Sequence, residues 1–206
     1  MPPTPSPNPQ PLTPTFSCPS VHGAPIAEGP TRAVFLDRDG VLIEDTGYPD
    51  DPEAISLLPG VGDGLRKLRD AGWRLVVVSN QSGVARGKFS IERLHSVHQR
   101  LRELLALEDV QLDALYFCPH HPQGSTEPYV HDCDHRKPQP GMLRSAAAEL
   151  GLDLAACWLI GDRESDVRAA HRAGCRAALL GTGPTAAELR CETLAEAAGE
   201  ILSFPS

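Results

Sequence analysis

Residues 33–40 read AVFLDRDG, four apolar residues followed by two aspartates that flank an arginine, and then a glycine. A short apolar run of this kind is typical of a strand buried on both faces of a parallel sheet. Carboxylates two positions apart at a strand end can face the same side, so we expect Asp37 and Asp39 to lie together. Two carboxylates that close repel each other unless a cation lies between them or one is protonated, and Mg²⁺ suits such oxygen ligands. The segment therefore predicts a strand that ends in a magnesium site. The alternatives are a solvated turn or a calcium loop, but the spacing does not fit an EF-hand.

Four further apolar runs of strand length follow, and helical patterns lie between most of them. In the clearest helical pattern, apolar residues recur at steps of three and four over 91–104, after Ser90 as a candidate N-cap. Shorter helical patterns end near Gly72, Gly151 and Gly174, which are plausible C-caps. This alternation predicts a three-layer, Rossmann-like α/β fold with a parallel sheet covered by helices on both faces, and with ligands at the carboxyl ends of the strands. The four runs are 75–78, 112–117, 158–160 and 177–180.

Composition favours one domain preceded by a tail. The chain has 206 residues, of which 41% are hydrophobic and 22% charged. Residues 1–30 hold ten of the 20 prolines and a single Asp, Glu, Lys or Arg, Glu28, so we expect a disordered tail over 1–30 and one domain over 31–206. A net charge of −8 argues against a nucleic-acid partner. With no apolar run of membrane-spanning length, six scattered cysteines and no secretory signal, we expect a cytoplasmic protein with no membrane partner and reduced thiols.

Polar groups follow the other predicted strands as well. The residues Ser79-Asn80-Gln81-Ser82 offer hydroxyl and amide groups that could bind phosphate oxygens, although a polar turn explains them equally well. After the fourth run, Asp162 would complete a magnesium site with Asp37. Asp166 belongs either to that site or to the start of a helix, where the helix dipole favours an acid. The pair Arg136-Lys137 could meet a phosphate, or could be a solvated basic pair before a helix.

Two Cys-x-His pairs bracket a 12-residue loop after the third strand. Cys118, His120, Cys133 and His135 together offer the tetrahedral ligand set of a structural zinc ion, with no coordination position left open. His121 and His131 are spare histidines that could replace one of these ligands, and incidental Cys and His residues are the alternative. The spacing predicts a loop clipped by zinc.

Together these segments resemble the haloacid dehalogenase (HAD)-like phosphatases, whose pattern is Asp-x-Asp-Gly, a Ser or Thr, a Lys, and Gly-Asp-x-x-x-Asp, each at a strand end. Within that family the likeness is to the heptose bisphosphate phosphatases, and it covers about residues 31–200. Two positions depart from the pattern: Val41 stands where the family has Thr, and His135 stands where the fourth zinc ligand is usually Cys. The segments that carry the likeness are 37–40, 79–83, 85–89, 118–125 and 136–138.

The resemblance implies a magnesium-dependent phosphatase that removes the 7-phosphate of a heptose 1,7-bisphosphate through an aspartyl phosphate on Asp37. It makes Asp39 the acid and base, gives the phosphate oxygens to Ser79 and Lys137, and assigns Mg²⁺ to the Asp37 carboxylate, the Asp39 carbonyl and the Asp162 carboxylate. We expect Mg²⁺ and Zn²⁺ as cofactors, a sugar phosphate as the small-molecule substrate, and a monomer. The rival interpretations are a histidinol-phosphate phosphatase and an inactive, zinc-stabilised binding module. The residues implied to line the substrate pocket are Asp45, Thr46, Gly47, Tyr48, Ser79, Asn80, Gln81, Ser82, Arg136, Lys137 and Arg163.

Overall fold

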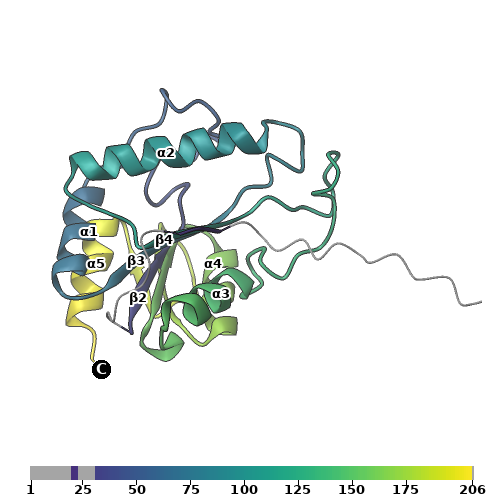
Figure 1. Cartoon of the computed structure of the whole chain (residues 1–206). Helices are drawn as coiled ribbons and strands as arrows, with labels where there is room; N and C mark the ends of the chain where they lie inside the picture. The colour runs from purple at the N-terminus through teal and green to yellow at the C-terminus, as the bar shows by residue number, and fades with distance from the viewer. Residues whose placement is uncertain (1–19, 23–30, 206) are drawn as a thin grey trace, which may run out of the picture.

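The computed structural model describes residues 20–22 and 31–205, which form a seven-stranded sheet between two layers of helices (Figure 1). The strand order across the sheet is β1-β4-β3-β2-β5-β6-β7. All neighbours are parallel except β1, which pairs antiparallel with β4 at one edge. The strands are β1 (Ser20–His22), β2 (Ala33–Leu36), β3 (Arg74–Asn80), β4 (Ala114–Cys118), β5 (Trp158–Gly161), β6 (Arg176–Leu180) and β7 (Leu189–Cys191).

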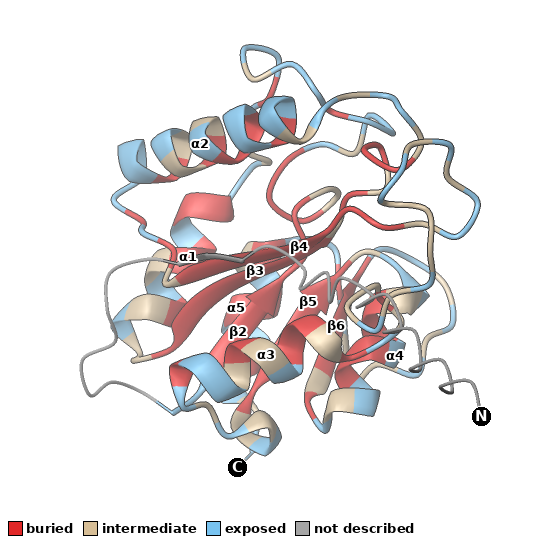
Figure 2. Cartoon of the chain, turned by 45° about the vertical axis from the view of Figure 1, so that its right-hand side comes forward, coloured by how far each residue is buried: buried red, intermediate tan, exposed pale blue. Residues whose placement is uncertain are grey.

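Helices cover both faces of the sheet and bury two separate apolar cores, as Figure 2 shows by the red strands between the helices. One core receives apolar side chains from α1, α2 and α5, and the other receives them from α3 and α4. The helices are α1 (Val61–Asp70), α2 (Ile91–Leu107), α3 (Gly141–Leu150), α4 (Glu164–Ala173) and α5 (Leu194–Ser203), with a short 3₁₀ turn η1 (Leu154–Ala156) before β5.

The central strand β2 is apolar throughout because both of its faces are buried. Val34 and Leu36 face the core under α1 and α5, while Ala33 and Phe35 face the core under α3 and α4. All four residues are fully buried because successive side chains of a strand point to opposite faces. The three-layer parallel architecture predicted from the sequence is therefore confirmed.

Local end signals also act as predicted. The Ser90 hydroxyl accepts a hydrogen bond from the Arg93 amide at 3.2 Å and caps α2. Gly151 and Gly174 end α3 and α4 in the left-handed region, at φ 64° and 90°.

Two parts of the fold differ from the prediction. Residues 20–22 were expected to belong to a disordered tail, yet they form β1, with Ser20 opposite Tyr116 of β4. An edge strand gains backbone hydrogen bonds whatever its side chains, so composition does not reveal it. The other residues of the predicted tail lie outside the described part of the chain. The sequence prediction also contained neither β7 nor α5, which complete the sheet and cover its end.

The strand order places a crevice beside β2. From β2 the chain proceeds outward through β3 and β4, then returns to place β5 on the other side of β2. At such a reversal, connections leave the two neighbouring strands in opposite directions, which opens a crevice at their carboxyl ends. Within the described residues no helix has the length and apolar character needed to span a membrane.

Candidate active site

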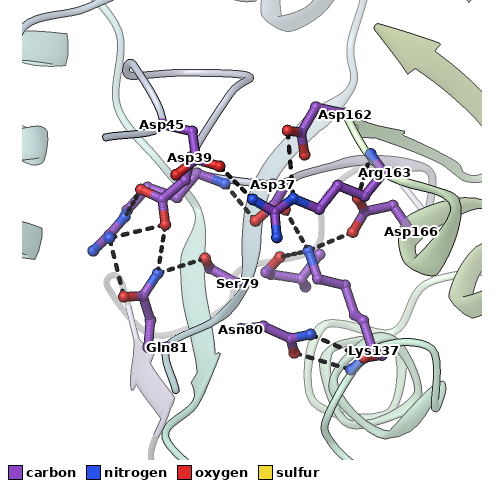
Figure 3. Close-up of polar contacts among 12 residues, drawn as sticks. Asp37, Asp39, Asp45, Ser79, Asn80, Gln81, Lys137, Asp162, Arg163 and Asp166 are labelled. Carbon is purple, nitrogen blue, oxygen red and sulfur yellow. Dashed lines mark hydrogen bonds and ion pairs between the residues drawn. The ribbon is translucent and has the colours of Figure 1, made fainter. Parts of the chain in front are cut away.

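The predicted polar residues meet at the carboxyl ends of four adjacent strands (Figure 3). Asp37 follows β2 directly, and its amide donates a hydrogen bond to the Ile160 carbonyl of β5 at 3.0 Å. On the other side, Asn80 at the end of β3 lies opposite Cys118 at the end of β4. The sheet register thus brings together side chains that are more than 120 positions apart in the chain.

Three carboxylates form the acidic centre of the crevice. Oxygens of Asp37, Asp162 and Asp166 all lie within 4.8 Å of one another. Burial, followed by the negative charges of Asp37 and Asp166, raises the pKa of Asp162 to about 6 against the opposing charge of Arg163. The pKa of Asp37 is also raised, first by burial and then by Asp166, against the opposing charge of Lys137. The carboxylates therefore repel one another without a cation.

The donor chemistry fits a magnesium ion. In the part of the chain that the structure describes, Asp162 Oδ1 is buried without a hydrogen-bond partner, so an oxygen ligand remains available for a metal. Close backbone packing holds this carboxylate in place, because a Cβ at Gly40 would lie 2.4 Å from Asp162 Oδ2. Gly40 also has φ +78°, which an L side chain rarely adopts. A small residue at this turn is thus required by both the backbone and the acidic centre.

Lys137 places a buried positive charge between two of these carboxylates. Its Nζ lies 2.9 Å from Asp37 Oδ2 and 2.6 Å from Asp166 Oδ1, and donates to the Val78 carbonyl at 2.8 Å. Burial alone would lower the pKa of Lys137, but the two carboxylates outweigh it and raise that pKa. The ammonium group therefore stays charged beside Asp37.

The side chain of Asn80 holds the lysine in place from the sheet. Its Nδ2 donates to the Lys137 carbonyl at 2.9 Å, and its Oδ1 accepts from the Lys137 amide at 3.0 Å. This reciprocal pair fixes the backbone of the loop that carries Arg136 and Lys137 against the end of β3. Asn80 therefore stabilises the position of this loop in addition to lining the cavity.

Asp39 is held by a second group of side chains. Arg38 is fully buried and binds the Asp39 carboxylate through Nε at 2.8 Å and Nη2 at 3.0 Å. Gln81 donates to both Asp39 Oδ2 and Ser79 Oγ at 2.9 Å. Asp37 and Asp39 thus lie on the same cavity with different partners, Lys137 for the first and Arg38 with Gln81 for the second.

A cavity of about 230 Å³ opens over these groups and contains most of the predicted pocket residues. Two of the predicted residues are placed elsewhere. Thr46 lines a neighbouring hollow beside Tyr48, and Ser79 is buried at the end of β3 beneath Gln81. At the rim, Arg163 Nη2 contacts Asp45 Oδ2. The predicted residues that line the cavity are Asp37, Asp39, Asp45, Gly47, Tyr48, Asn80, Gln81, Ser82, Arg136, Lys137 and Arg163.

Three of the four predicted zinc ligands come together. Ligand atoms of Cys118, His120 and Cys133 lie within 4.8 Å of one another, with Cys118 Sγ 3.6 Å from His120 Nδ1. His135 is not in this group. Its Nε2 lies instead 3.1 Å from Ser145 Oγ. The ring of His131 is 4.1 Å from that of His120. Two thiols and an imidazole suit zinc, so the residues present fit a metal clip, while the fourth ligand stays a prediction.

The loop that carries this cluster is joined to the cavity through its backbone. The Cys118 carbonyl accepts from the Gln81 amide at 2.7 Å, and the His120 carbonyl accepts from Arg136 Nη1 at 3.3 Å. The position of Arg136 on the cavity wall thus depends on the same segment that holds two of the clustered ligands.

The sequence left Asp166 open between the magnesium site and the start of a helix, and it gave Arg38 no role in the site. Asp166 pairs with Lys137 and also accepts a hydrogen bond from the Arg163 amide at 3.1 Å, so it is both a site residue and part of the start of α4. A signal for Asp166 was present, because it is the last residue of the Gly-Asp-x-x-x-Asp pattern. Arg38 had no such signal, since an arginine between two aspartates reads as an exposed residue.

Comparison with known proteins identifies relatives of this chain. A family model described as HAD-hydrolase-like matches residues 135–200. The D-glycero-beta-D-manno-heptose-1,7-bisphosphate 7-phosphatase of Salmonella typhi is 48% identical over 141 residues, which cover 68% of this chain and 75% of that protein. The D-glycero-D-manno-heptose-1,7-bisphosphate 7-phosphatase of Thermosynechococcus vestitus is 46% identical over 158 residues, 75% of this chain and 81% of that one.

Solved structures resemble the whole described domain. The D,D-heptose 1,7-bisphosphate phosphatase of B. bronchiseptica, complexed with magnesium and phosphate, superposes with a TM-score of 0.74 at 33% identity and covers 84% of this chain and 99% of its own. A protein from Mesorhizobium loti described as a HAD-like phosphatase superposes with a TM-score of 0.79 at 36% identity, over 88% of each chain.

Proposed function

Since this chain belongs to the HAD-like phosphatases, in the group of the heptose-1,7-bisphosphate 7-phosphatases, we propose that it hydrolyses the 7-phosphate ester of D-glycero-D-manno-heptose 1,7-bisphosphate. Zn²⁺ would clip the loop over 118–135, and Mg²⁺ would be held by the Asp37 and Asp162 carboxylates with the Asp39 carbonyl. When bound, Mg²⁺ supplies the positive charge that lets a phosphate approach the acidic centre. The expectations of a monomer, a cytoplasmic location and no nucleic-acid or membrane partner stay predictions.

In the first half of the reaction, a carboxylate oxygen of Asp37 attacks the phosphorus atom and the bond to the sugar oxygen breaks. Asp37 is oriented for this by the Arg38 amide, which donates to Oδ1 at 2.7 Å, and by Lys137 on Oδ2. Asp39 gives a proton to the departing sugar oxygen. The products of this half are an aspartyl phosphate and the free sugar hydroxyl.

In the second half, Asp39 takes a proton from a water molecule that attacks the same phosphorus atom. The bond between phosphorus and the Asp37 oxygen breaks, which releases inorganic phosphate and restores the carboxylate. Lys137 and Ser79 hold the equatorial phosphate oxygens through both halves, where charge shifts in the transition state.

Arg136 favours a substrate with two phosphates over histidinol phosphate. Its guanidinium lines the same cavity as Asp37, and among the described residues no carboxylate forms an ion pair with it. Arg136 is half-buried, and this burial lowers the pKa of its guanidinium. A second phosphate would neutralise this charge with paired hydrogen bonds, whereas the cationic amine of histidinol phosphate would be repelled.

The test is phosphate release from heptose 1,7-bisphosphate and from histidinol phosphate, each with Mg²⁺ and with a chelator. We expect Mg²⁺-dependent release from the bisphosphate, with ³¹P NMR showing that the 1-phosphate remains. Faster turnover of histidinol phosphate would overturn the substrate assignment. An Arg136→Met variant should lose most of its preference for the bisphosphate, through a higher KM.

A further inference from the structure

Gln81 is the first residue after β3, and its side chain contacts three groups of the site (Figure 3). It is 3% exposed. Its Oε1 accepts from Arg38 Nη2 at 3.0 Å, and its Nε2 donates to Asp39 Oδ2 and to Ser79 Oγ, each at 2.9 Å. One amide therefore joins the proposed acid to the proposed phosphate-binding hydroxyl.

The orientation of this amide follows from its partners. A guanidinium has only donors, so the group that faces Arg38 must be the carbonyl oxygen Oε1. The amide nitrogen Nε2 then faces Asp39 and Ser79 with its two hydrogens. Because Arg38 is fully buried, no exchange with solvent competes for the Oε1 position.

This orientation determines how Ser79 can act. Nε2 has hydrogens to give and no lone pair to receive one, so Ser79 Oγ is the acceptor in that bond. The hydroxyl hydrogen of Ser79 is consequently directed away from Gln81. In the proposed reaction this hydrogen is donated to a phosphate oxygen that enters the site beside the buried Ser79. Without this neighbour the Ser79 hydroxyl could rotate, and its hydrogen would not be preorganised toward the charge that develops on the phosphate oxygens.

The same nitrogen restrains Asp39 from the other side. The carboxylate is bound at Oδ1 by Arg38 Nε and at Oδ2 by both Arg38 Nη2 and Gln81 Nε2. Asp39 is 18% exposed and lines the cavity, so the carboxylate is held in position while still reaching the substrate space.

We infer that Gln81 is a positioning residue of the reaction, which fixes Asp39 for proton transfer to the leaving group and fixes the Ser79 hydroxyl as a donor. The inference rests on the proposed function for the role of Asp39. It assigns Gln81 a role in the chemical step, in addition to its place on the wall of the substrate pocket.

The experiment compares two leaving groups under single-turnover conditions, where release of the leaving group reports formation of the aspartyl phosphate alone. A sugar alkoxide needs a proton from Asp39 to depart, whereas 4-nitrophenolate does not. The variants are Gln81→Leu, which removes both polar atoms, and Gln81→Glu, which keeps an acceptor for Arg38 but has no hydrogens for Asp39 and Ser79 when ionised. Gln99→Leu, on the exposed face of α2, is the matched control.

For Gln81→Leu we expect a rate roughly 100-fold lower on the sugar phosphate and about 10-fold lower on 4-nitrophenyl phosphate. The melting temperature should fall by a few degrees because Arg38 loses a buried hydrogen-bond partner, and rates are compared at a temperature where the variant is folded. Gln81→Glu should not restore either rate. An equal loss on both substrates would overturn the role in proton transfer, and a wild-type rate in Gln81→Glu would overturn the role of the Nε2 hydrogens. If the wild-type chain rejects the heptose, glycerol 3-phosphate serves as the alkyl ester, so failure of the substrate assignment is recorded separately.

Discussion

At the scale of single residues, two aspartates that lie two positions apart in the sequence have different partners in the site. Asp37 faces Lys137 and the other carboxylates of the acidic centre, whereas Asp39 faces Arg38 and Gln81. The first arrangement suits a nucleophile whose charge is balanced by a cation, and the second holds a carboxylate at a fixed position on the cavity wall. One turn after β2 thus gives two side chains different surroundings, which supports the two different roles proposed for them.

Replacing Asp37 by Asn removes the attacking oxygen while keeping the shape of the side chain. We expect phosphate release to fall by at least about 1,000-fold, with no change in KM large enough to explain it. Steady-state assay with saturating Mg²⁺ measures this. Asp50→Asn, an exposed aspartate that belongs to the neighbouring loop, should keep wild-type turnover.

The carboxylate cluster predicts how the metal-free protein responds to pH. The pKa of Asp162 is raised to about 6 in the folded chain, above its ordinary 3.8, and Asp37 shifts in the same direction. The folded state then binds protons more tightly than the unfolded state, so stability is lost as pH rises from about 4 to about 6. The loss should be on the order of 1 to 2 kcal/mol, a decrease of about 5 °C in melting temperature.

Thermal unfolding in EDTA at several pH values checks this slope, and added Mg²⁺ should recover the lost stability at pH 7. A metal-free protein that becomes steadily more stable between pH 4 and pH 6 would show that the cluster does not control its pH dependence.

Gly40 offers a test of the packing behind the acidic centre. A Gly40→Ala side chain would meet Asp162 Oδ2, so we expect Mg²⁺ affinity to fall by about 10-fold or more as well as a loss of stability. Gly151 also has a positive φ, but a Cβ there would meet no atom of the described residues within 4 Å. Gly151→Ala should therefore cost about 1 kcal/mol of stability with unchanged Mg²⁺ binding, measured by calorimetry.

At the scale of elements, the sequence revealed those with strong local patterns. The core of β2, the cap at Ser90 and the glycines that end α3 and α4 were all predictable because the information lies within a few residues. β1 was not predictable, since its pairing with β4 depends on backbone groups. α5 had a usable apolar period at Leu194, Ala197, Ala198 and Ile201, so its omission was an error of interpretation.

The loop over 118–135 is the element whose contribution is most directly testable. If a metal joins Cys118, His120 and Cys133, Cys133→Ala should reduce bound zinc from one atom per chain to near zero. Because the His120 carbonyl holds Arg136, KM for the bisphosphate should rise by about 10-fold while kcat changes less. Elemental analysis and steady-state kinetics measure the two effects. Cys191→Ala, which alters a buried cysteine outside this loop, is the control.

The fourth ligand can be settled on the same element. His135→Ala should release zinc if the predicted ligand set is right, and His131→Ala should not. The opposite pattern would assign the fourth position to His131, whose ring lies beside that of His120.

At the scale of the whole molecule, the order of strands makes the site possible. The return of β5 to the side of β2 brings Asp162 and Asp166 to Asp37, and the loop after β4 delivers Lys137 to the same point. The sequence predicted that strand ends would carry the chemistry, but the contacts between Lys137 and Asp166 and between Arg38 and Asp39 depend on side-chain directions. Those directions are set by packing across the fold and are not contained in any local pattern.

The role of Asp37 as the nucleophile is tested most directly by identifying the residue that is phosphorylated during turnover. Wild-type protein mixed with the heptose bisphosphate and Mg²⁺, quenched in acid and digested, should yield a peptide that carries one phosphoryl group on Asp37. The group should be absent when Mg²⁺ is chelated and absent in Asp37→Asn. Phosphate released at the wild-type rate with no label at any time, or a label on a different residue, would contradict the account.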